Sequence, residues 1–126
     1  MARNAEKATA MLEEIGAGDR LVFIQGDATN QNDIEAFADK TVETYGSIDI
    51  LVNNAGGAGG LLPAVNLFDE AFDLCMKWNV YSTFWAKRHA LKHMLAIKWG
   101  SVINMSSVEG KNGKPVLTAY VTANMR

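Results

Sequence analysis

The stretch that decides the fold is IDILVNNAG, residues 48–56. An apolar run followed directly by two asparagines, an alanine and a glycine is typical of a buried strand that ends in a loop. Residues 21–24 (LVFI) and residues 101–105 (SVINM) are two further short runs of the same kind. Strands of this type suit a parallel sheet that is covered on both faces.

Helical patterns separate these runs. Residues 5–15 and 30–45 carry apolar side chains at spacings of three and four, and residues 67–98 contain no glycine or proline. We expect a break in the last segment just before Asn79, because a helical run of that length usually contains one. The alternation of strands and helices predicts an α/β fold with right-handed crossovers, in a single domain over residues 1–126.

The ends of the first two helices are also marked in the sequence. Asn4 and Asn30 stand where a side chain caps the free amides of a helix start. Gly16 and Gly46 stand where a left-handed residue ends a helix.

The composition limits the class of protein. Hydrophobic residues make up 48% of the 126 residues, and the formal net charge of -2 gives no reason to expect a nucleic acid or an anionic membrane as partner. Cys75 is the only cysteine, so no intrachain disulfide can form. No apolar stretch approaches the ~18 residues of a membrane span, and no secretory signal is visible. We therefore expect a soluble, cytoplasmic protein with Cys75 packed in its core.

Polar residues follow two of the predicted strands, at the place where ligands bind in parallel sheets. Residues 53–56 (NNAG) can bond to a ligand through their amides, and the glycine allows a close approach. Asp27 follows residues 21–24, and its carboxylate or the next amide can hold an adenine amino group. An ordinary turn explains each group about as well, so both interpretations stay open.

Two other patterns are weaker than they look. Residues 56–60 (GGAGG) lack the spacing and the following helix of a dinucleotide fingerprint, so we expect a mobile loop over a cleft there. His89 and His93 are four residues apart and could chelate a metal from one helix face. No carboxylate, cysteine or third histidine stands at a supporting spacing, so we predict no metal site.

Ser107 and Tyr120 carry the sharpest chemical signal. A tyrosine ordinarily titrates near ~10, so it serves as an acid or base at neutral pH only when a nearby cation stabilises the phenolate. A serine hydroxyl beside it can hold the oxygen of a substrate. Isolated serines and tyrosines are usually structural, and the order of the surrounding motifs is what favours a site.

Five motifs in sequence resemble the short-chain dehydrogenase/reductase family, and the resemblance runs through most of the chain. They are Asp27-Ala28, residues 50–56 (ILVNNAG), Asn79-Val80, residues 103–107 (INMSS), and the stretch from Ser107 through Gly113 and Pro115 to Tyr120. The resemblance implies an oxidoreductase that uses NAD or NADP to interconvert an alcohol and a carbonyl compound. Its substrate would be a small-molecule alcohol or ketone.

The resemblance also implies roles for individual residues. Tyr120 matches the tyrosine that transfers the proton, Ser107 the serine that positions the substrate oxygen, and Asn79 the asparagine that holds a water of the proton relay. Arg3 falls near a position that contacts the adenosine ribose, where an arginine favours NADP. The family residues that contact or support the adenosine half of the cofactor match Asp27, Ala28, Asn54, Ala55 and Gly56.

The chain departs from the family pattern in three places. Asn124 stands where the family has a lysine that assists the tyrosine and binds the nicotinamide ribose. The family's opening strand and glycine-rich pyrophosphate turn have no counterpart before Met1, and its last two strands have none after Arg126. The implied fold is a partial Rossmann-like, doubly wound parallel sheet that retains three strands and lacks the first two and the last two.

These departures shape what we expect of the chain alone. We expect little activity, and either poor folding or a sheet in which the three strands pair in chain order. The parent enzyme is expected to be a homo-oligomer. Two alternatives remain: a non-catalytic, cofactor-binding or regulatory relative, and a fragment that a partner chain completes.

Overall fold

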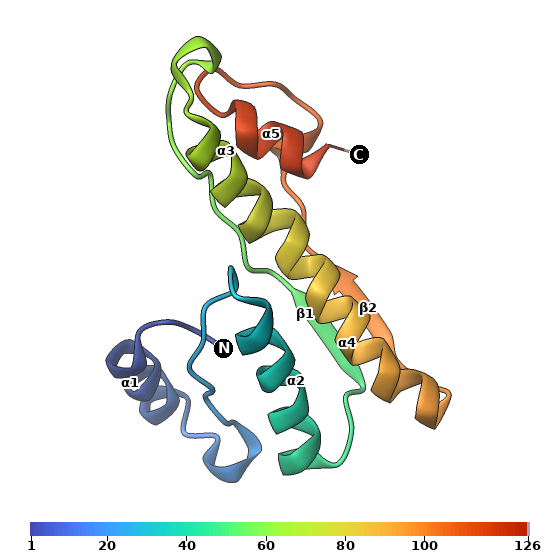
Figure 1. Cartoon of the computed structure of the whole chain (residues 1–126). Helices are drawn as coiled ribbons and strands as arrows, with labels where there is room; N and C mark the ends of the chain where they lie inside the picture. The colour runs from blue at the N-terminus through green and yellow to red at the C-terminus, as the bar shows by residue number, and fades with distance from the viewer. Residues whose placement is uncertain (126) are drawn as a thin grey trace.

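The computed structural model describes residues 1–125. Helices α1 and α2 come first, and helical segments and strands alternate after them, as Figure 1 shows. No helix in this range has both the length and the apolar character needed to cross a membrane. The main elements are α1 (Ala5–Ile15), α2 (Gln31–Tyr45), β1 (Ile50–Asn53), α3 (Asp69–Met76), α4 (Ser82–Ile97), β2 (Ser101–Asn104) and α5 (Thr118–Asn124).

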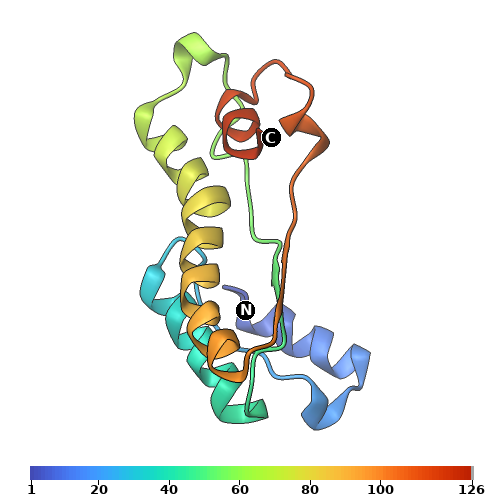
Figure 2. The ribbon, with the colours of Figure 1, turned by 90° about the vertical axis from the view of Figure 1, so that its right-hand side faces the viewer.

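The two strands pair in parallel, with Ile50 opposite Ser101 and Asn53 opposite Asn104. Helices α2 and α4 pack against each other on one side of this sheet (Figure 2). The core between them and the sheet is formed by Ala38, Ile48, Ala90 and Met94, with Val42, Leu51, Leu91 and Val102 packed around it. The predicted α/β arrangement with a parallel sheet is therefore present.

The prediction of a third strand at residues 21–24 is wrong. Residues 21–24 form no ladder, and the isolated bridge nearby joins the next residue, Gln25, to Ala2. The sheet within residues 1–125 contains β1 and β2 alone. Leu21 and Val22 are 39% and 41% exposed. An apolar run favours an extended backbone, but a strand also needs a neighbouring backbone to pair with.

The expectation that the sheet is covered on both faces is wrong as well. Ile50, Val52 and Ile103 are 58%, 55% and 44% exposed, because α2 and α4 cover only the opposite face. The apolar character of the strands indicated burial on both faces, and the second cover is missing from the described residues.

The predicted helix ends are confirmed. The Asn4 side chain accepts from the Lys7 amide, and the Asn30 side chain accepts from the amides of Asn32 and Asp33. Gly16 and Gly46 end α1 and α2 with φ angles of 61° and 86°, in the left-handed region that glycine adopts without strain.

Candidate active site

The break predicted before Asn79 takes the form of a π-helical turn. Residues Lys77–Tyr81 form this turn between α3 and α4, so the two helices continue as one rod, as Figure 1 shows. A single π turn inside an α-helix is often found at a functional site, because it displaces side chains from the regular helical pattern.

The side chain of Asn79 fastens the loop that follows β1 to this turn. Its Nδ2 donates to the carbonyl of Gly57 at 2.7 Å and to the carbonyl of Cys75 at 2.7 Å. Its Oδ1 accepts from the Gly57 amide at 3.3 Å. Cys75 is fully buried beneath this contact, as predicted, and burial raises the pKa of its thiol.

Glycines let the same loop lie close to the helix. A Cβ at Gly56 would lie 2.6 Å from Asn79 Oδ1, and one at Gly57 would lie 2.8 Å from the Trp78 ring. A Cβ at Gly59 would meet the Ala71 carbonyl, and Gly59 has a φ of 72°. Packing therefore accounts for these glycines, in line with the rejection of a dinucleotide fingerprint at this loop.

All five residues predicted to hold the adenosine half of a cofactor line two adjoining cavities. The first, of about 270 Å³, is bordered by Ala28, Asn54 and Ala55. The second, of about 340 Å³, is bordered by Ala28 and Ala55 together with Asp27, Gly56, Arg3 and Trp78. The segment at Asp27 and the motif that follows β1, far apart in the sequence, thus meet at one place.

Asp27 is held in a turn at the rim of the second cavity. Its Oδ1 accepts from the Thr29 amide and the Thr29 hydroxyl, both at 2.8 Å, and its own amide donates to Asp33 at 2.8 Å. The Thr29 amide is the main reason that the pKa of Asp27 lies below its ordinary value, with a smaller contribution from Arg3. The Arg3 guanidinium lies 3.9 Å from Asp27 Oδ2 and 5.8 Å from the centre of the Trp78 ring.

Ser107 and Tyr120 lie on elements that pack together. Ser107 caps the short 3-10 helix Val108–Gly110, where its Oγ accepts from the Glu109 amide at 3.2 Å. Tyr120 is half-buried in α5, which packs against this 3-10 helix and against α3. Both residues therefore belong to the same end of the molecule as Asn79.

A third cavity, of about 490 Å³, lies at this end. It is bordered by Asn79, Asn104, Ser106 and Asn124, among others. Neither Ser107 nor Tyr120 borders it, so the structure brings Asn79 to the neighbours of these residues rather than to the residues themselves. The Asn124 side chain donates to the Tyr120 carbonyl at 2.9 Å, and the Asn124 carbonyl accepts from the Ser106 hydroxyl at 3.3 Å.

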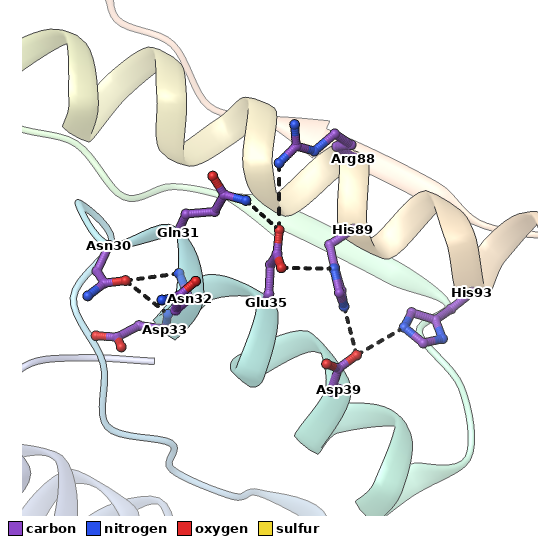
Figure 3. Close-up of polar contacts among 9 residues, drawn as sticks. All are labelled: Asn30, Gln31, Asn32, Asp33, Glu35, Asp39, Arg88, His89 and His93. Carbon is purple, nitrogen blue, oxygen red and sulfur yellow. Dashed lines mark hydrogen bonds and ion pairs between the residues drawn. The ribbon is translucent and has the colours of Figure 1, made fainter.

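The histidine pair on α4 has a carboxylate neighbour that its spacing in the sequence did not indicate. Asp39 on α2 lies beside both His89 and His93 on α4, as Figure 3 shows, so the statement that no carboxylate supports the histidine pair is wrong. The hydrogen bond from His89 is the main reason that the pKa of Asp39 lies below its ordinary value. The signal was the spacing of Glu35 and Asp39, four residues apart on α2, which matches that of the histidines.

A sequence profile described as short chain dehydrogenase matches residues 1–125. The 3beta-hydroxysteroid dehydrogenase 2 of Eggerthella lenta is 34% identical over 109 residues, which are 85% of this chain and 42% of that protein. The NADPH-dependent pterin aldehyde reductase of Arabidopsis thaliana is 33% identical over 119 residues, which are 94% of this chain and 49% of that protein. The chain thus spans less than half the length of these relatives.

Solved structures give the same result for the fold. The structure of ElxO with NADP bound superposes with a TM-score of 0.87 at 27% identity, over 97% of this chain and 50% of that one. The KRED1-Pglu enzyme superposes with a TM-score of 0.87 at 25% identity, over 98% and 50%. These matches confirm the predicted Rossmann-like class and the resemblance that the motifs indicated.

Proposed function

Because this chain belongs to the short-chain dehydrogenase family, an oxidoreductase family, we propose that it provides the adenosine-binding wall and the Ser–Tyr pair of an NAD(P)-dependent alcohol or carbonyl oxidoreductase. The observation that carries this proposal is the convergence of residues 27–28 with residues 54–56, which follow β1, on adjoining cavities that share Ala28 and Ala55. Relatives named as steroid, borneol and pterin aldehyde enzymes support a small-molecule alcohol or carbonyl substrate.

The residues at these cavities fit the adenosine half of a nicotinamide cofactor. Because Gly56 has no side chain, the loop can lie close to Asn79 while its backbone borders the second cavity. Trp78 borders the same cavity and offers an aromatic ring there. The Asp27 carboxylate, held by Thr29, is an acceptor at the rim. The bound cofactor supplies the hydride or receives it.

Arg3 favours NADP over NAD. Its side chain is 68% exposed, and its pairing with Asp27 at 3.9 Å is that of a weak surface ion pair. The guanidinium is therefore free to turn toward a 2′-phosphate, whose oxygens it can contact in pairs. The NADP bound in ElxO, a structural neighbour, supports this preference.

In the proposed reaction, Tyr120 passes a proton to or from the substrate oxygen and Ser107 donates a hydrogen bond to that oxygen. Asn79 positions the loop after β1 by binding both backbone groups of Gly57. Asn124 brings no charge near Tyr120, and its amide is directed to the Tyr120 carbonyl. Since a tyrosine needs a cation to act at neutral pH, we expect slow turnover with cofactor binding intact.

A non-catalytic, cofactor-binding role is the second candidate, and the same Asn124 favours it. The two functions share the adenosine site and differ in the proton-transfer step. A gain of turnover when a lysine replaces Asn124 would distinguish them, because only the enzyme would respond.

Nucleotide titration followed by tryptophan fluorescence tests the proposal, since Trp78 borders the cavity. We expect the protein to bind NADPH more tightly than NADH. Arg3→Gln should weaken the affinity for NADPH by about tenfold, or ~1.4 kcal/mol, and leave the affinity for NADH unchanged. Arg20→Gln is the matched control, because Arg20 lies in the 3-10 helix Gly18–Arg20, away from these cavities. Failure of both nucleotides to bind would contradict the proposal.

A further inference from the structure

We propose that Asp39, His89 and His93 form a zinc-binding site that links α2 to α4. Both histidines project from one face of α4 toward Asp39 on α2, as Figure 3 shows. The Asp39 Oδ1 lies 2.7 Å from His89 Nε2 and 3.4 Å from His93 Nε2. One ligand atom from each residue lies within 4.8 Å of the other two.

Two of the histidine nitrogens in this cluster lack a hydrogen bond. His89 Nδ1 and His93 Nε2 are buried, and no residue among 1–125 is within hydrogen-bonding geometry of either. The side chain of His89 is 11% exposed and that of His93 is 31% exposed, whereas Asp39 is 53% exposed. Of these two nitrogens, His93 Nε2 is the one that faces Asp39, so an ion that enters from the Asp39 side would meet an unpaired ring nitrogen already turned toward it.

The donor set suits zinc. Two imidazole nitrogens and a carboxylate oxygen are ligands that Zn²⁺ accepts, with bonds of about 2.0–2.2 Å. Ligand atoms around a tetrahedral ion then lie roughly 3.3–3.6 Å apart. The 3.4 Å separation of Asp39 and His93 already matches, and the 2.7 Å contact of Asp39 with His89 opens slightly when the ion replaces the shared proton. Water completes the coordination.

Glu35 completes the arrangement around the ligands. Its Oε2 lies 3.8 Å from His89 Nδ1, the nitrogen opposite the proposed ligand atom. A metal-bound histidine commonly donates its other N–H to a carboxylate, which fixes the ring and increases its basicity. Glu35 is itself oriented by Gln31 at 2.8 Å and by Arg88 at 3.6 Å. The Arg88 charge is thereby paired with Glu35 beside the site.

The site lies apart from the proposed cofactor cavities and would have a structural role. None of its three ligands borders the cavities at the strand ends. Its ligands come from helices that pack side by side and contribute Ala38, Ala90 and Met94 to the core. An ion held by both helices would oppose their separation, so zinc would stabilise the folded protein by mass action.

Calorimetric titration of the protein with zinc chloride tests the site. We expect one ion per chain, and a melting temperature that rises with zinc and falls again with a chelator. His93→Gln and Asp39→Asn should each weaken the affinity for zinc at least tenfold. Circular dichroism would show that both variants stay folded. Glu43→Gln is the matched control, because Glu43 lies on α2 but pairs with Lys40 instead.

Cobalt substitution separates this site from Cys75, the only thiol in the sequence. A cobalt site of nitrogen and oxygen ligands shows visible d–d bands without a thiolate charge-transfer band. The proposal is overturned if zinc does not bind, if His93→Gln binds it as tightly as the original chain, or if the thiolate band appears. Unchanged cofactor binding in the zinc-free protein is expected, because the two sites share no residue.

Discussion

The Asn79 side chain binds both backbone groups of Gly57, with Nδ2 to the carbonyl at 2.7 Å and Oδ1 to the amide at 3.3 Å. One side chain on the π turn therefore pairs with both backbone groups of this loop residue, and the Cys75 thiol on α3 adds a weaker bond to the same carbonyl at 3.3 Å. Because this loop leads out of β1, the contact fixes the position of the residues after the strand that border the second cavity. The catalytic asparagine of the family pattern has a structural task in this chain.

Asn79→Ala should destabilise the fold by about 1–3 kcal/mol, because the partly buried amide of Gly57 loses its acceptor and the Gly57 carbonyl keeps only the weak thiol donor of Cys75. Urea unfolding measured by circular dichroism would show this as a lower midpoint. Asn112→Ala is the control, since Asn112 is exposed in a turn. Equal midpoints for the two variants would mean that the Gly57 contact contributes nothing.

Gly59→Ala should destabilise the chain by at least about 2 kcal/mol, since the added methyl meets the Ala71 carbonyl and the residue has a φ of 72°. Gly113→Ala provides the comparison, because its Cβ would enter open space. That change should be neutral or slightly stabilising, through the smaller entropy of the unfolded chain. Thermal unfolding of both variants checks the pair, and a Gly59 variant as stable as the Gly113 variant would refute the packing described for the loop.

Local chemistry determined which parts of this fold were predictable. The caps at Asn4 and Asn30 and the ends at Gly16 and Gly46 were predicted correctly, because each depends on one residue and its adjacent turn. The position of the irregularity near Asn79 was predicted, but its form as a π turn was not, since the spacing of apolar residues does not reveal the hydrogen-bond pattern of the turn.

The errors came from contacts between distant segments. Residues 21–24 are extended but unpaired in the ladder, because pairing depends on a neighbour that the apolar run itself does not specify. Asp39 was missed for the same reason: it is 50 residues from His89, and only the packing of α2 on α4 brings the two together. Asn54 and Asp27 border adjoining cavities although residues 21–24 do not join the sheet. The family resemblance had assigned both positions to the same half of the cofactor, so their proximity was predictable without a third strand.

Acid should weaken the contribution of Asp27 to stability. Hydrogen bonds from Thr29 lower its pKa in the folded chain below the ordinary 3.8, so the charged form is the one that folding favours. This stabilisation is complete above the ordinary pKa and is lost as the pH falls through the lowered value. Asp27→Asn keeps an oxygen acceptor but cannot titrate, so its stability should change less between pH 5 and pH 2. Chemical unfolding between pH 5 and pH 2 measures the free energy of unfolding of each protein, with Asp19→Asn at an exposed position as the control. If that free energy fell equally with pH in Asp27→Asn and in the original chain, the prediction would be contradicted.

Asn124→Lys should raise the rate of carbonyl reduction at least tenfold, because a lysine ammonium would stabilise the phenolate form of Tyr120, and a tenfold change corresponds to about 1.4 kcal/mol of barrier. The rate is followed as NADPH oxidation with a panel of ketones and aldehydes. Thr44→Lys adds the same charge at an exposed position of α2 and should leave the rate unchanged, which separates a local effect from one of net charge. Tyr120→Phe in the Asn124→Lys background should remove the gain. If the lysine variant binds NADPH but turns over no faster, the non-catalytic, cofactor-binding role is favoured, since the cation that the proton transfer requires would then be present without effect.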